Sequence, residues 1–203
     1  MPVKSASLKS RLAGVLSASQ RREFAKLLLV DLLEVLSDAG LVGSTYVVSS
    51  DRQALRIALK LGACGIREEK DRGVNSAVLE GINGSGSPEV VLVLPSDLPL
   101  VRASEVKAIL GLKSSGFGVV ISPSRGFTGT NALAYSPSSG LVLSYDDDSF
   151  WNHLASAARG GLKTAVSSRF GIMFDVDSPE DFRSLARSSI QRESVEFARR
   201  NSR

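Results

Sequence analysis

The sequence has little of the chemistry that thiolate-bound metals and disulfides require. Its 203 residues contain one cysteine, Cys64, and one histidine, His153. A single cysteine excludes an intramolecular disulfide, which fits the reducing cytoplasm. One cysteine with one histidine also excludes a Cys/His zinc cluster. Any metal is therefore expected to be a hard cation, such as Mg²⁺, held by carboxylate oxygens.

Long apolar runs are also missing. None approaches the roughly 20 residues that a membrane-spanning helix needs, and residues 1–5 lack the apolar core of a signal peptide. We therefore expect a cytoplasmic protein that does not enter a membrane. Hydrophobic residues make up 43% of the chain and charged residues 23%, which is typical of one globular domain over residues 1–203.

The positive charge gathers at the carboxyl end. Residues 183–203 hold six arginines against two glutamates, a net +4 that equals the net charge of the whole chain. Such a tail could contact nucleic acid. It lacks interleaved aromatic residues and any nucleic-acid motif, so we expect no nucleic-acid partner. We favour a basic amphipathic helix over about 190–203, partly buried through Ile190, Val195, Phe197 and Ala198.

Apolar periodicity alternates between helix and strand along the chain. It predicts helices at about 20–38, 51–61, 73–82, 103–112, 149–159 and 179–188, and strands at about 46–48, 64–67, 90–94, 118–122, 131–135 and 172–174. This alternation indicates βαβ units in a three-layer α/β fold with a mostly parallel central sheet. The uninterrupted apolar run at 90–94 predicts a central parallel strand buried on both faces, and 131–135 predicts an antiparallel one.

The beginning of the chain departs from this pattern. A doubly wound domain usually opens with an apolar strand that leads into its first loop. Here only Met1-Pro2-Val3 precedes Lys4. Either the first strand is very short or it has lost residues, and the sequence leaves both explanations open.

Ligands of open α/β sheets bind beyond the carboxyl ends of the strands, and Asp97 follows the 90–94 strand. Pro95 and Pro99 stiffen the turn around it, so its carboxylate is well placed to coordinate Mg²⁺. The alternative is that Asp97 caps the next helix.

A second acidic segment follows the predicted strand at 172–174. Asp175 and Asp177 point to the same face of an extended chain, so both could approach one metal ion. Asp181 stands three residues after Ser178, with Pro179 between them. This spacing is typical of a helix start, and we assign Asp181 to a capping box rather than to the metal.

The basic, serine-rich opening could hold a triphosphate through Lys4, Lys9 and Arg11, although the GxxxxGK[ST] spacing is absent. Gly73 and Asn75 begin a predicted helix. Asn75 could read a base through its amide and main chain, or serve only as a helix-start residue.

A glycine-containing segment at 126–131 follows the strand at 118–122. It permits close approach of a small anion, and Thr130 supplies a hydroxyl. The alternative is a simple turn. His153 stands alone on an apolar helix, where we expect a packing role rather than catalysis.

Six segments, in this order, resemble the 2-phospho-L-lactate guanylyltransferase family over about residues 3–185. They are Lys4 with 9–12, 73–77, 95–100, 129–133, 149–153 and 175–181. The resemblance implies a Rossmann-like nucleotidyltransferase fold and a homodimer. It also implies transfer of GMP from GTP to 2-phospho-L-lactate or phosphoenolpyruvate, with release of pyrophosphate, in coenzyme F-420 biosynthesis.

The resemblance assigns a role to each motif. It gives the triphosphate to the basic opening, with Lys9 catalytic beside Asp97, and the guanine to Gly73 and Asn75. It gives Mg²⁺ to Asp97, Asp175 and Asp177. It gives the phosphoacid to Thr130 and Ser149, with Asp146 as a third substrate-binding candidate. One departure concerns Asp146, where family members commonly carry glycine after an aromatic residue. An acidic run at 146–148 beside an anionic acceptor is unexpected. It turns away, binds metal, or alters acceptor preference.

Two rival functions stay open. The first is another nucleotidyltransferase of the same fold, acting on a sugar phosphate or molybdopterin, against which the 129–131 and 149–150 segments argue. The second is a non-catalytic nucleotide- or RNA-binding protein that uses the arginine-rich tail.

Overall fold

The computed structural model describes residues 1–3 and 10–202. Its helices are α1 (Ala18–Asp38), α2 (Arg52–Lys60), α3 (Val74–Gly84), α4 (Ala103–Ser114), α5 (Ser149–Arg159), α6 (Phe170–Met173), α7 (Pro179–Ala186) and α8 (Glu193–Asn201). Its strands are β1 (Tyr46–Ser49), β2 (Cys64–Arg67), β3 (Val91–Val93), β4 (Val119–Pro123), β5 (Thr130–Tyr135) and β6 (Thr164–Val166). Within this part of the chain, no helix is long and apolar enough to cross a membrane.

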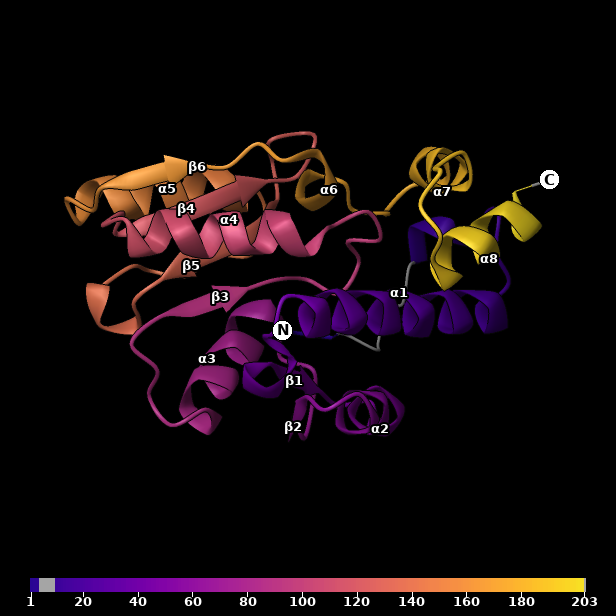
Figure 1. The fold of residues 1–203 in the computed structure, drawn as a ribbon, viewed down its shortest axis with the longest axis horizontal. Coiled ribbons are helices and arrows are strands. Elements are labelled where there is room, and N and C mark those ends of the chain that lie inside the picture. The colour runs from indigo at the N-terminus through magenta and orange to yellow at the C-terminus, as the bar shows by residue number, and fades with distance from the viewer. Residues whose placement is uncertain (4–9, 203) are drawn as a thin grey trace.

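The longest helix, α1, extends from near the centre of the molecule toward the end that carries α7 and α8, and it contacts α2, α4 and α8 (Figure 1). Its start is encoded locally by a capping box. The Gln20 amide donates to Ser17 Oγ, and the Ser17 amide donates to Gln20 Oε1 at 2.9 Å. Asp51 caps α2 with its side chain, whose Oδ1 accepts from the Gln53 amide at 2.7 Å.

The strands form two sheets. Strands β1 and β2 pair in parallel, and the second sheet has the order β3-β5-β4-β6. Strand β5 runs antiparallel to both β3 and β4, as the sequence predicted for 131–135, while β4 and β6 are parallel. The prediction of a central parallel strand at 90–94 is wrong: β3 lies at the edge of its sheet beside an antiparallel partner. A continuous apolar run indicates burial, but it does not specify the direction of the neighbouring strand.

Residues 1–3 lie along β1. Pro2 and Val48 form a parallel bridge, with the Val3 amide 2.9 Å from the Val48 oxygen. A hollow of about 680 Å³ lies between this segment, β1 and β3, and is lined mainly by apolar side chains. Within residues 1–3 and 10–202, no strand pairing joins the two sheets. Helices and side-chain packing hold them together.

Helices α4 and α5 cover opposite faces of the four-stranded sheet. Successive residues of β4 alternate between the two faces, because strand side chains have a period of two. Val120 packs in the cluster that contains Val106 and Ile109 of α4. Val119 and Ile121 pack instead with Phe150 and Ala157 of α5.

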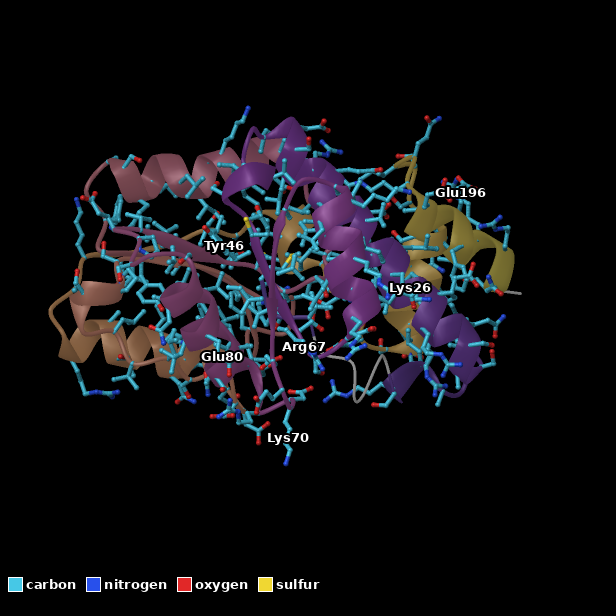
Figure 2. All side chains as sticks on the ribbon, turned by 90° about the horizontal axis from the view of Figure 1, so that it is seen from below. Lys26, Tyr46, Arg67, Lys70, Glu80 and Glu196 are labelled. Carbon is cyan, nitrogen blue, oxygen red and sulfur yellow. The ribbon has the colours of Figure 1, made fainter. Side chains whose placement is uncertain are left out.

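The carboxyl-terminal helix α8 is part of the core, as the amphipathic interpretation of the tail predicted. Phe197 of α8 stacks on Phe24 of α1 with ring centroids 5.6 Å apart, and Phe182 of α7 meets Phe24 edge-on at 5.1 Å. Glu196 of the same helix is exposed (Figure 2). The buried Asp31 of α1 accepts hydrogen bonds from the Ser194 amide and hydroxyl, which ties the start of α8 in place.

All six predicted helices are present, but residues 170–174 differ from the prediction. The expected strand at 172–174 is wrong, since this segment forms the short helix α6, and β6 was not predicted. A tertiary contact holds α6: the Glu105 carboxylate accepts from the Gly171 amide at 3.1 Å and from the Arg102 amide at 2.9 Å. Three apolar residues in a row do not encode such a contact.

Gly171→Ala tests this packing. A Cβ atom at Gly171 would overlap Glu105 Oε2 and the Leu100 carbonyl oxygen. We expect the free energy of unfolding to fall by about 1–3 kcal/mol, as overpacking typically costs. The matched control is Gly111→Ala in α4, where a Cβ meets nothing within 4 Å and stability should rise by about 0.5–1 kcal/mol. Urea unfolding measures both, and a Gly171→Ala protein as stable as wild type would contradict the packing argument.

Candidate active site

A cleft of about 410 Å³ opens at the carboxyl end of β3. It brings together side chains from four segments that the sequence singled out: Arg11, Asp97, Thr130 and Asp177. Val74, Tyr145, Ser96 and Ser10 also line it. Lys4 and Lys9, the other predicted triphosphate ligands, lie outside the described residues.

The two acidic segments lie side by side, because the Val176 amide donates to the Asp97 carbonyl oxygen at 3.3 Å. Asp175 is crowded by negative charge. Burial, and then the neighbouring Asp97, raise the pKa of Asp175 to about 6, while the Asn131 amide, 3.2 Å away, opposes the shift. Like charges held this close favour a cation between them.

The carboxylates do not make a finished metal cage. Among the described residues, no group of three or more His, Cys, Asp or Glu side chains is arranged to hold a metal. Mg²⁺ commonly takes only one or two carboxylates and completes its shell with phosphate oxygens and water. The Asp97 and Asp175–Asp177 region therefore fits a Mg²⁺ ion that arrives with a phosphate ligand.

The helix starts show whether Asp97 and Asp181 act as helix caps. Helix α4 begins at Ala103, and Glu105 accepts from the amide of Arg102, so Asp97 does not cap it. Asp181 forms the predicted capping box: its carboxylate accepts from the Ser178 amide at 2.8 Å, and its own amide donates to Ser178 Oγ. Arg125 also pairs with Asp181.

Arg11 pairs with Asp177, with Nη1 and Oδ2 3.6 Å apart. The two side chains are 78% and 45% exposed, and an ion pair this open to water contributes little to stability. Separating the pair would therefore cost little free energy. A triphosphate could then bind Arg11, and a cation could bind Asp177.

Thr130 meets α5 because β5 contains a bulge. Ala132 pairs with Ser122 and Thr130 with Pro123, which leaves Asn131 as an extra residue. In a regular strand, Thr130 would share the α4 face with Ala132. Instead its Oγ1 lies 3.0 Å from His153 Nδ1 and 3.2 Å from Ser149 Oγ, both on α5. The segment at 124–129 is the hairpin turn before this bulge, with the Ser124 amide 2.8 Å from the Gly129 oxygen.

Asn75 lies at the start of α3, but its side chain is engaged by the acidic loop. Its Oδ1 accepts from the Tyr145 amide at 2.8 Å, and its Nδ2 donates to Asp146 at 3.3 Å. Asp146 is exposed and turns toward Asn75. Gly73 is the residue before α3 and has a φ of 90°, a backbone conformation that favours glycine.

Three residues of this region were not singled out as site residues from the sequence. Asn131 donates to Asp175, Tyr145 lines the cleft, and His153 is fully buried with both ring nitrogens in hydrogen-bond contact. Asn131 and Tyr145 each stand beside a residue that was singled out, and that adjacency was the available signal. For His153 the sequence offered only an isolated histidine.

The chain matches known proteins over nearly its full length. The family described as guanylyl transferase CofC like matches residues 1–201. A phosphoenolpyruvate guanylyltransferase from Rubrobacter xylanophilus is 39% identical over 93% of this chain and 92% of its own length. A 2-phospho-L-lactate guanylyltransferase from Methanocaldococcus vulcanius is 33% identical, over 86% and 77% respectively.

Solved structures share the fold at low sequence identity. A nucleotidyl transferase from Methanothermobacter superposes with a TM-score of 0.63 at 17% identity, over 98% of this chain and 97% of that one. A cytidylyltransferase from Leptospira borgpetersenii gives 0.59 at 13% identity, over 85% and 81%. The fold is thus that of nucleotidyltransferases, as the family resemblance implied. From its match over residues 1–201 and these relatives, the chain belongs to the CofC-like guanylyl transferase family.

Proposed function

We propose that this protein transfers GMP from GTP to a small three-carbon phosphoacid, 2-phospho-L-lactate or phosphoenolpyruvate, and releases pyrophosphate in coenzyme F-420 biosynthesis. One observation carries the proposal: a single cleft contains Arg11, the Asp97–Asp177 carboxylates and Thr130. These side chains provide a cation, a metal-binding edge and a neutral hydrogen-bonding group. That set suits a metal-bound triphosphate and an acceptor acid.

On the nucleotide side, Arg11 binds the triphosphate, together with Lys4 and Lys9, and we retain Lys9 as a catalytic residue. Gly73 and Asn75 bind the guanine. The Asn75 side chain already holds Tyr145 and Asp146, so its main chain is the better guanine contact. Asp97, Asp175 and Asp177 hold Mg²⁺, which when bound supplies positive charge for the oxygens of the transferring phosphate.

On the acceptor side, Thr130 and Ser149 bind the phosphoacid. Ser149 is the first residue of α5, and the amino end of a helix favours a negatively charged ligand. Asp146, the first residue of the acidic run, is hydrogen-bonded to Asn75. For Asp146, this contact supports a turn away from the acceptor, so that Asp146 shapes the site through Asn75.

The proposed reaction needs no general base. An oxygen of the acceptor phosphate attacks the α-phosphorus of GTP, the bond from that phosphorus to the bridging oxygen breaks, and pyrophosphate leaves. A phosphate oxygen is already ionised at neutral pH. The chain therefore contributes by holding both anions in line and offsetting their charge. We further propose a cytoplasmic homodimer, supported by the family resemblance and by the single cysteine.

The reaction predicts a specific pyrophosphate release. With GTP and Mg²⁺, purified protein should release pyrophosphate with 2-phospho-L-lactate, phosphoenolpyruvate or both. Sugar 1-phosphates and molybdopterin are the control acceptors, and ATP, CTP and UTP the control donors. A coupled pyrophosphate assay measures each pair. Release that requires a sugar phosphate, or no release with any acceptor, would contradict the proposal.

Asp97→Asn tests the metal-binding edge. We expect kcat to fall by at least about 100-fold, because the charge stabilisation that a catalytic metal supplies is worth several kcal/mol. The melting temperature should not fall, since the substitution relieves repulsion with Asp175. The matched control, Asp38→Asn at the exposed end of α1, should keep wild-type activity. Near-wild-type turnover by Asp97→Asn would contradict the assignment.

A further inference from the structure

His153 is more than a packing residue, because both of its ring nitrogens have defined partners. It is fully buried on α5, and burial lowers its pKa to about 4. The imidazole is therefore neutral at pH 7, with one nitrogen protonated and the other free to accept. The backbone identifies which one: the Ser144 amide lies 3.0 Å from Nε2, and an amide can only donate.

The proton consequently lies on Nδ1, the nitrogen 3.0 Å from Thr130 Oγ1. The ring also interacts with the Ser149 backbone, one turn earlier in α5, which opposes the fall of its pKa. With Thr130 Oγ1 within hydrogen-bond distance of Nδ1, His153 donates to that hydroxyl. Ser149 Oγ donates to the same oxygen at 3.2 Å. A threonine hydroxyl can accept two hydrogen bonds and donate one. With both acceptor positions filled, Thr130 can act toward a further ligand only as a donor.

The hydroxyl proton of Thr130 is available to a ligand in the cleft. Among the described residues, no hydrogen bond uses the Thr130 proton, and Thr130 lines the cleft beside Arg11 and Asp97. Tyr145 lines it too, and its buried hydroxyl has no partner in the described part of the chain. The Tyr145 ring packs edge-on against His153 with centroids 4.8 Å apart.

We propose that His153 is a positioning residue for the acceptor: by donating to Thr130, it fixes that hydroxyl as a hydrogen-bond donor toward an ionised phosphate or carboxylate oxygen of the phosphoacid. This inference rests on the proposed function and adds the residue that sets the polarity of its acceptor site. The phosphoacid must present an anionic oxygen to Thr130. A ligand group that donates a hydrogen bond would find no free lone pair on the Thr130 hydroxyl.

Nitrogen-15 NMR tests directly which ring nitrogen of His153 carries the proton. His153 is the only histidine of the chain, so its ring signals need no assignment by mutation. At pH 7 we expect a neutral ring with the proton on Nδ1, although free histidine favours the Nε2 tautomer. A proton on Nε2, or a doubly protonated ring, would overturn the inference. This readout does not depend on activity.

Kinetics tests the link to the acceptor. An asparagine amide lies about where His Nδ1 lies, and a glutamine amide about where Nε2 lies. His153→Gln should raise the KM for the phosphoacid roughly 10-fold or more, as expected for a hydrogen bond to a charged group, and leave the KM for GTP unchanged. His153→Asn, which can still donate to Thr130, should recover part of that loss.

A double-mutant cycle separates positioning from a purely structural role. Thr130→Val should raise the KM for the phosphoacid as much as His153→Gln does. The double variant should have a KM no higher than that of Thr130→Val alone. Additive losses, equal effects on both KM values, or a His153→Asn protein weaker than His153→Gln would each overturn the inference. If the wild-type protein releases no pyrophosphate with any acceptor, the proposed function itself fails. An active wild type with the wrong tautomer refutes only the role of His153.

Discussion

One extra residue in β5 determines how the side of the cleft around Thr130 is built. Strand β5 is antiparallel to both neighbours, so its first residues lie at the same edge of the sheet as the last residues of β3 and β4. The bulge at Asn131 then exchanges the two faces for the first residues of the strand. Thr130 turns to α5, and Asn131 turns to α6, where it donates to the Ile172 oxygen and to Asp175. Without the bulge, neither the Thr130 network nor the Asn131 contact with the acidic segment could form.

The sequence was informative where structure depends on near neighbours. The caps at Ser17, Asp51 and Ser178 are contacts over two or three residues, and the Ser178–Asp181 capping box is present as its spacing predicted. The position of Asp97 at the end of a strand was also predictable, since β3 ends just before it. Asp177 was expected beside it on the same ground, but the segment before Asp177 is helix α6, and the two acidic segments meet through the Val176 amide and the Asp97 carbonyl oxygen.

Features that depend on two distant segments were not predictable. The direction of the strand beside β3 is a property of the pair, and the helix at 170–173 depends on the Glu105 carboxylate more than 60 residues away. A bulge exists only as a difference in register between two strands. The polarity of Thr130 requires three partners, Ser144, Ser149 and His153, whose mutual geometry no spacing rule contains.

The packing of Phe24 has a consequence for how the chain is made. Its ring is fully buried, and the rings that cover it belong to Phe182 and Phe197. Contacts over such separations are costly to close and form late. During synthesis the Phe24 end of α1 therefore stays uncovered until α7 and α8 have been made, whereas the part of α1 that packs with α2 and β1 can be buried earlier. One helix is thus buried in two stages, and its Phe24 end is the part that needs protection from aggregation in the interval.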